Sequence, residues 1–168
     1  MGKRTRTLYP LLVAGTMVMG GLLGATSASA APGCVVSAGV TQNANTVTGT
    51  GGNDTIDCTS ADRAKTITGG GGNDTITGTA FADKIDGGTG NDTLTGGNGD
   101  DTLTGGAGSD TLTGGPGADT LSGGTGDDTL TGAAADGGKD TLNGNAGTDT
   151  CSAVGTDPDS RTSCEKLG

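Results

Sequence analysis

The sequence predicts an all-β chain built as a solenoid of short strands that stack coil upon coil. The first observation is a strict nine-residue period over residues 87–131, which read GGTGNDTLT, GGNGDDTLT, GGAGSDTLT, GGPGADTLS and GGTGDDTLT. The second is composition, because 37 of the 168 residues are Gly and the only aromatic residues are one Tyr and one Phe. A Gly-rich chain with few aromatic residues is usually a linker or disordered. A solenoid core, however, needs only one apolar side chain per strand, and each of these units supplies one.

The repeat resembles the G-G-x-G-x-D-x-U-x nonapeptide of the RTX (haemolysin-type) calcium-binding family. The resemblance covers residues 40–152, nearly all of the chain after the first 39 residues. It implies a right-handed parallel β-roll of about twelve nonapeptide units, in which two units make one turn. Successive strands would then alternate between two facing parallel sheets, with Ca²⁺ bound between the Gly/Asp turns.

The first 30 residues have the features of a secretory signal peptide. Lys3, Arg4 and Arg6 form a basic start, residues 8–23 are largely apolar, and Ala28-Ser29-Ala30 offers a small-x-small cleavage site. A retained membrane anchor is less favoured, because no basic stop-transfer segment follows. We therefore expect a secreted, extracellular protein with no membrane insertion after cleavage.

The repeat phase extends in both directions from the regular block. A lead-in of residues 31–39 carries Cys34, and a tail of residues 153–168 leaves the pattern and carries Cys164, which we expect to serve as a C-terminal cap. Before the regular block lie a degenerate first unit (40–48), a match (49–57), a two-residue insertion (58–59), a unit with Lys65 in the Asp place (60–68), a full match (69–77) and a unit lacking two glycines (78–86). After the block lie a unit lengthened by three residues (132–143) and a last unit with Cys151 in the Leu place (144–152).

The spelling of one unit predicts its conformation. Gly adopts positive φ without steric cost, so the first six residues suit a tight turn. The last three residues, typically Thr-Leu-Thr, suit a very short strand with Leu inward and both Thr outward. On the two-sheet arrangement, one inward stack is Ile56, Ile76, Leu94, Leu112, Leu130 and Cys151, and the other is Val47, Ile67, Ile85, Leu103, Leu121 and Leu142.

The aspartates of successive same-sided turns recur every 18 residues in the regular part of the chain. Stacked turns at strand spacing would bring neighbouring carboxylates within roughly 5 Å, where like charges repel unless a cation lies between them. Ca²⁺ accepts six to eight oxygens from carboxylates and turn carbonyls. An ordinary turn role for Asp does not explain the common phase. The predicted ligands of several Ca²⁺ ions are Asp54, Asp74, Asp83, Asp92, Asp101, Asp110, Asp119, Asp128, Asp140 and Asp149.

Lys65 departs from the family pattern. We expect the gap between Lys65 and Asp83 to lack a metal, with the ammonium group standing in for the cation.

The net charge and the cysteines both fit an extracellular protein that binds cations. Removal of residues 1–30 leaves six basic and 19 acidic residues, a net charge of −13, which disfavours nucleic acid and anionic lipid as partners and favours cations. Four cysteines in an oxidising compartment predict two disulfides. Local pairing of Cys34 with Cys58 and of Cys151 with Cys164 would cap the two ends of the roll, and is favoured over the two crossed pairings.

These observations predict a secreted calcium-binding structural or surface protein that folds when it meets calcium. An extracellular surface or matrix is a candidate partner, which the sequence does not identify. Non-repeat segments are short, so no separate catalytic domain is expected. An ice-binding solenoid is an alternative, because T-L-T strands would present rows of outward Thr. An enzyme is the less favoured alternative, because the chain has no His to pair with a nucleophile, and Ca²⁺ would occupy any carboxylate pair between turns first.

Overall fold

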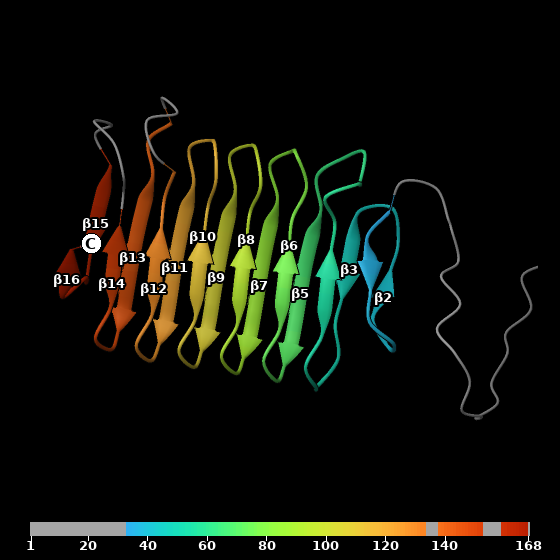
Figure 1. Ribbon diagram of the computed structural model, residues 1–168, viewed down its shortest axis with the longest axis horizontal. Coiled ribbons are helices and arrows are strands. Elements are labelled where there is room, and N and C mark those ends of the chain that lie inside the picture. Colours follow the sequence, from blue (N-terminus) through green and yellow to red (C-terminus); the bar gives the residue numbers. More distant parts are fainter. Residues whose placement is uncertain (1–32, 134–137, 153–158, 168) are drawn as a thin grey trace, which may run out of the picture.

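The computed structural model describes residues 33–133, 138–152 and 159–167, and this part of the chain consists of strands and turns. The strands stack side by side along one axis into an elongated roll (Figure 1). The predicted signal peptide lies outside the described residues. Within the described ranges there is no helix with the length and hydropathy needed to cross a membrane.

The roll consists of two eight-stranded sheets, and the chain alternates between them. The first sheet contains, in order, β1 (Val35–Val36), β4 (Thr55–Asp57), β6 (Thr75–Thr77), β8 (Thr93–Thr95), β10 (Thr111–Thr113), β12 (Thr129–Thr131), β14 (Thr150–Ser152) and β16 (Lys166–Leu167). The second sheet contains β2 (Thr41–Gln42), β3 (Thr46–Thr48), β5 (Thr66–Gly71), β7 (Lys84–Thr89), β9 (Thr102–Ala107), β11 (Thr120–Thr125), β13 (Thr141–Ala146) and β15 (Ser160–Thr162). Neighbouring strands from β3 onwards are parallel, which confirms the predicted two-sheet solenoid.

The core is a double column of apolar side chains, one from each strand from β3 to β14. Leu112 of β10 pairs in register with Leu94 of β8 and with Leu130 of β12, and all three side chains are fully buried. The second sheet repeats this arrangement at Leu103 and Leu121. All twelve residues predicted to point inward are buried. Because each strand contributes a single core side chain, each coil packs mainly against the coils on either side of it.

The strands of the second sheet are longer than the three residues predicted for every unit. From β5 to β13 each has six residues, because the paired glycines after the Thr-Leu-Thr segment stay in the hydrogen-bonded ladder. Gly88, for example, pairs with Gly70 and has a φ of 107°. A Cβ at Gly88 would overlap the Gly70 carbonyl, so this close backbone approach requires glycine.

The predicted insertions are accommodated in turns without loss of register. Thr55 pairs with Thr75, 20 residues later, and Thr129 pairs with Thr150, 21 residues later, whereas regular coils pair at 18. The tip of the second insertion, residues 134–137, lies outside the described residues. Strand pairing therefore re-forms after each insertion, because the inward Leu or Ile and the outward Thr residues determine the register.

Both ends of the roll are closed by a disulfide, as predicted. Cys34 is bonded to Cys58 at the N-terminal end, and Cys151 is bonded to Cys164 at the C-terminal end. The N-terminal end differs from the body, because β1 pairs with β4 and β2 pairs with β3 in the antiparallel sense. These terminal strands are only two residues long, which limits the edge available for pairing with another chain.

The C-terminal tail differs from the sequence-based expectation that it leaves the repeat pattern. Its described residues add one more coil, because β15 pairs in parallel with β13 and β16 pairs in parallel with β14. Asp159, directly before β15, and Glu165, directly before β16, stand in the places that Asp occupies before the strands of the body. The described residues of the tail therefore continue the solenoid by one coil.

Candidate metal site

The predicted ligand aspartates form two rows of stacked carboxylates, which we name the aspartate ladder. In each row the Oδ1 atom of one Asp accepts a hydrogen bond from the backbone N–H of the Asp one coil earlier. Asp92 donates to Asp110 at 2.7 Å, and Asp101 donates to Asp119 at 2.8 Å. One row contains Asp54, Asp74, Asp92, Asp110, Asp128 and Asp149, and the other contains Asp83, Asp101, Asp119 and Asp140. The ladder continues across the three-residue insertion, where Asp128 donates to Asp149 at 2.9 Å.

The second carboxylate oxygen of most ladder residues has no hydrogen-bond donor. All ten side chains are at most 4% exposed, so water does not solvate these atoms well. Among the described residues, buried Oδ2 atoms without a hydrogen-bond partner occur at Asp74, Asp92, Asp101, Asp110, Asp128 and Asp149. A buried carboxylate oxygen with no donor is costly unless a cation or a proton neutralises it.

Each of these oxygens lies in a small space that only glycine leaves open. A Cβ placed on Gly105 would overlap Asp110 Oδ2, and it would also come within 2.6 Å of the Gly123 carbonyl oxygen in the next coil. The same pair of oxygens, one carboxylate and one carbonyl, surrounds the first glycine of neighbouring units, including Gly87 and Gly96. Two acceptor oxygens that converge in this way match the oxygen ligands that Ca²⁺ takes.

When no cation is present, burial destabilises the ionised form of the ladder carboxylates. Desolvation is the largest effect, and it raises the pKa of Asp101 to about 7 and that of Asp110 to about 6, with the charges of neighbouring ladder residues adding to it. The pKa values of Asp74, Asp92 and Asp128 are also raised, again mainly by desolvation. A bound cation reverses this balance, because it stabilises the ionised form.

Asp54, at the N-terminal end of the ladder, differs from the body because the protein itself satisfies its carboxylate. Oδ1 accepts from Ser37 Oγ at 2.8 Å, and Oδ2 accepts from the Thr50 N–H at 2.6 Å and from the Thr50 hydroxyl at 2.9 Å. These bonds, that of Ser37 first, lower the pKa of Asp54. Asp54 is therefore stable as an anion without a metal.

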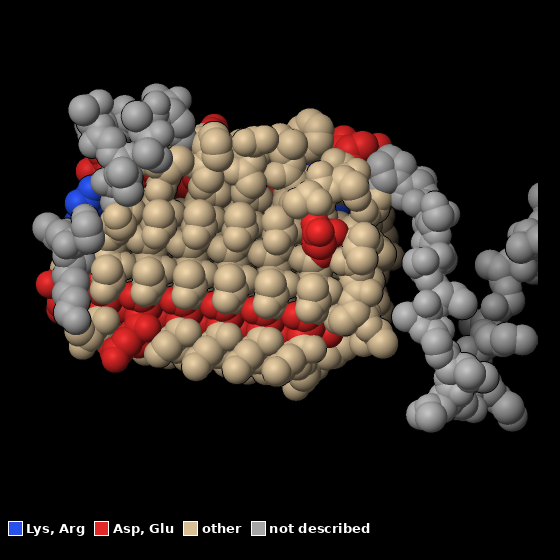
Figure 2. All heavy atoms as spheres, in the orientation of Figure 1, with Lys and Arg blue, Asp and Glu red and all other residues tan. Residues whose placement is uncertain are grey.

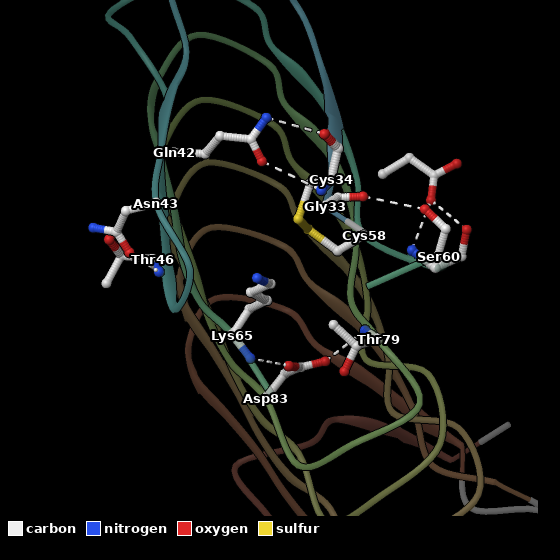
Figure 3. Close-up of a disulfide and its surroundings, with 12 residues drawn as sticks. Gly33, Cys34, Gln42, Asn43, Thr46, Cys58, Ser60, Lys65, Thr79 and Asp83 are labelled. Carbon is white, nitrogen blue, oxygen red and sulfur yellow. Dashed lines mark hydrogen bonds between the residues drawn. A yellow bond between two sulfur atoms is a disulfide. The ribbon is translucent and has the colours of Figure 1, made fainter. Parts of the chain in front are cut away.

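Asp83 is satisfied in the same way, and Lys65 does not act as predicted. Asp83 accepts from the backbone N–H groups of Lys65 and Thr79, at 2.5 Å each. The Lys65 ammonium group points away from Asp83 and donates to the Ala44 carbonyl at 2.5 Å (Figure 3). Its charge lies on the N-terminal side of the coil, because a side chain at the ladder place points toward the preceding coil, as each ladder aspartate does.

The acidic residues lie along the stacked turns of the roll. Figure 2 shows a continuous band of acidic atoms running parallel to the long axis, between rows of uncharged side chains. Within the described ranges no three His, Cys, Asp or Glu side chains gather into one metal-binding group. The ladder instead offers stacked carboxylates together with backbone carbonyls, a donor set suited to a hard cation rather than to zinc.

Sequence reasoning missed Asp159 and Glu165, which add one further step to each row. Asp159 Oδ1 accepts from the Asp140 N–H at 3.0 Å, and Glu165 Oε2 accepts from the Asp149 N–H at 2.7 Å. The available signal was an acidic residue directly before Ser-Arg-Thr and Lys-Leu. Neither residue follows the paired glycines and third glycine of the consensus, so the nonapeptide pattern does not include them.

Comparison with known families agrees with the geometry. The model of the RTX calcium-binding nonapeptide repeat (4 copies) matches residues 41–57, 68–103, 77–112, 104–137 and 113–151. Searches of curated proteins and of solved structures gave no match. The stacked Asp turns, the two parallel sheets and this match over most of the chain have one explanation: the chain belongs to the family of RTX calcium-binding nonapeptide repeats.

Proposed function

We propose that this chain is a secreted structural protein that binds several Ca²⁺ ions between its stacked turns and requires them to fold. The observation that carries the proposal is the set of buried Oδ2 atoms without donors, each beside a backbone carbonyl and a glycine. Membership of the RTX repeat family supports calcium as the cation.

The proposed ligands are the ten ladder aspartates, and they differ in whether Oδ2 is free to bind a metal ion. Asp74, Asp92, Asp101, Asp110 and Asp128 have an unsatisfied Oδ2, so a bound ion replaces no hydrogen bond there. Asp54, Asp83 and Asp140 must each give up a protein hydrogen bond at Oδ2 to bind a metal there, so we expect their sites to be the weakest. Bound Ca²⁺ supplies the positive charge that lets neighbouring carboxylates ionise together, while the chain holds the oxygens in place.

An extracellular location fits both the disulfides and the calcium requirement. Disulfides persist in oxidising compartments, and both disulfides here close an end of the roll. Extracellular calcium modules bind at roughly 10⁻⁴–10⁻³ M, so a roll of this kind would remain unfolded inside the cell and fold after export. The folded roll would then act as a surface, scaffold or matrix component, with an extracellular surface as its partner.

Calorimetric titration with two matched variants tests this proposal. Asp110→Asn keeps the acceptor for the Asp92 N–H but removes a buried charge, so it should bind fewer calcium ions than the wild type. Asp100→Asn is the control, because Asp100 is an exposed acid that also accepts a backbone N–H, from Ala118, outside the ladder. The proposal fails if the wild type binds no calcium, or if the two variants bind alike.

Ice binding is a second candidate, and the register of the first sheet favours it. From β6 to β14 the outward positions form two uncharged rows, Thr75, Thr93, Thr111, Thr129 and Thr150 beside Thr77, Thr95, Thr113, Thr131 and Ser152. On the second sheet Lys84 and Asp86 interrupt the equivalent rows. Thr is also a good strand residue on an exposed face, which explains the rows without any ligand.

Thermal hysteresis decides between these explanations. If the first sheet binds ice, Thr111→Lys should abolish the effect, while Thr102→Lys on the second sheet should leave it intact. No hysteresis in the calcium-loaded wild type would rule ice binding out.

A further inference from the structure

The last aspartate of the repeats, Asp149, is buried in the same way as the aspartates in the middle of the ladder. Its side chain has no exposed surface, and its Oδ2 atom has no hydrogen-bond donor among the described residues. If the ladder ended at Asp149, this oxygen would face either solvent or a capping donor. It faces the coil formed by the tail instead.

The tail places a backbone carbonyl beside this oxygen. A Cβ on Gly144 would overlap both Asp149 Oδ2 and the Ser163 carbonyl oxygen. One coil earlier, a Cβ on Gly123 would meet Asp128 Oδ2 and the Gly144 carbonyl oxygen. The Ser163 carbonyl therefore takes the place that the carbonyl of the first glycine takes in a nonapeptide.

The tail also places a carboxylate at the next step of the ladder. Glu165 Oε2 accepts from the Asp149 N–H at 2.7 Å, as Asp149 Oδ1 accepts from the Asp128 N–H at 2.9 Å. A return bond from the Glu165 N–H to the Asp149 carbonyl, 3.0 Å long, holds the two segments together. In a nonapeptide, the carbonyl of the first residue and the carboxylate of the sixth take these positions. In the tail, the three residues 163–165 supply both groups.

We propose that Asp149, Glu165 and the Ser163 carbonyl form an additional Ca²⁺ site, which lies between the last nonapeptide and the tail. The inference rests on the proposed calcium binding of the repeats, and it assigns a ligand outside the matched residues, which end at 151. Cys164 lies between Ser163 and Glu165 and is bonded to Cys151, so the disulfide holds two of the three ligands against the roll. Calcium and the disulfide together then close the C-terminal end.

A purely structural cap makes a different prediction, and Glu165→Gln separates the two roles, while Gly144→Ala tests the position of the ion. Glu165→Gln retains an acceptor for the Asp149 N–H but removes the charge, so a cap survives and a calcium site does not. Gly144→Ala keeps Glu165 but places a methyl group between Asp149 Oδ2 and the Ser163 carbonyl, which blocks the ion directly. Asp127→Asn is the matched control, because Asp127 is an exposed acid that accepts the Thr148 N–H at 2.8 Å outside the ladder.

The experiment counts the calcium ions bound per chain by metal analysis after equilibrium dialysis, alongside the rate at which a thiol reductant opens Cys151–Cys164. We expect Glu165→Gln and Gly144→Ala each to bind one ion fewer than the wild type and to be reduced several-fold faster in calcium. Asp127→Asn should match the wild type in both. If either of the two site variants retains the wild-type number of ions, the terminal site is wrong while the repeats still bind calcium. A wild type that binds no calcium would overturn the proposed function itself.

Discussion

At the scale of single residues, the two oxygens of each ladder carboxylate have different roles. Oδ1 of Asp110 holds the preceding coil through the Asp92 N–H, and Oδ2 remains without a donor beside Gly105. The repeat therefore needs Asp rather than Asn for the second oxygen, and Gly at the first place because a Cβ would fill the space. The sequence alone predicted the Asp and its period, but the separate roles of the two oxygens required the structure.

Glycine at the first place of the repeat can be tested by adding one methyl group. Gly105→Ala should raise the calcium concentration needed for half-maximal folding by several-fold, because the new Cβ would overlap Asp110 Oδ2 and approach the Gly123 carbonyl. Gly51→Ala should have little effect, because nothing lies within 4 Å of its Cβ position. Calcium titrations followed by circular dichroism compare the two, and an equal midpoint for both variants would contradict the assignment of the ion to this space.

Protons should compete with calcium for the same carboxylates. The folded, metal-free roll has Asp101 with a pKa raised to about 7 and Asp110 with a pKa raised to about 6, above the ordinary value of 3.8. Because the folded state binds these protons more tightly than the unfolded state, acid stabilises the metal-free roll, and this gain is lost as pH rises through about 6 to 7.

The expected result is that the calcium midpoint of folding rises as pH falls from 8 to 5, since the ion must displace protons. In chelator, strand content should increase over the same fall in pH. A calcium midpoint that does not change between pH 8 and pH 5 would show that the raised pKa values do not belong to the ligands.

At the scale of one coil, the sequence was most informative where the nonapeptide repeat is regular. The inward residues and both disulfides were predicted, because each unit has one apolar residue at the same place and the cysteines lie close to the two ends of the repeats. The alternation between two sheets was predicted from the resemblance to the repeat family, and the spacing of apolar residues alone does not determine it. The coil formed by the tail was not predicted, because Ser163 and Glu165 take the ligand places without any glycine. The satisfied carboxylates of Asp54 and Asp83 depend on residues that depart from the repeat consensus: Ser37 in the lead-in, and Thr50 and Thr79 in the place of the second glycine.

Coils whose carboxylates are already satisfied should tolerate loss of calcium best. When calcium is removed stepwise by a chelator, hydrogen exchange should increase first around Asp92, Asp110 and Asp128, whose Oδ2 atoms have no donors. The Thr50 amide, which donates to Asp54 close to the Cys34–Cys58 disulfide, should lose its protection last. Mass spectrometry of peptic peptides resolves this order, and simultaneous loss along the whole roll would show that the ends are no less dependent on calcium than the middle.

At the scale of the whole molecule, the core is narrow and stabilises the fold little, whereas the large negative charge destabilises it. The chain from residue 31 onwards carries six basic and 19 acidic residues, and each coil buries only one apolar side chain per strand. On the proposed function, calcium would neutralise the charge where it is concentrated, and the two disulfides restrict the unfolded chain at its two ends. The fold would then depend on metal, disulfides and core together.

Reduction of the disulfides should make the roll more dependent on calcium without changing its architecture. The bonded cysteines are 24 and 13 residues apart, and closing a loop of about this size contributes ~3 kcal/mol on the chain-entropy model. A Cys151→Ser, Cys164→Ser double variant should therefore need more calcium to fold. Calcium titrations of folding, compared with the wild type, measure the difference in midpoint. If the midpoint stays the same, the C-terminal disulfide does not contribute to closing the roll.

The most direct measurement is the far-ultraviolet circular dichroism of the chain from residue 31 onwards, recorded in excess chelator, in calcium and in magnesium. We expect a largely disordered spectrum in chelator, because the buried carboxylates of the ladder then lack a counterion. Strand signal should appear on addition of calcium, and much less with magnesium, which demands stricter octahedral geometry. A full strand signal in excess chelator at neutral pH would contradict the claim that calcium between the stacked turns drives folding.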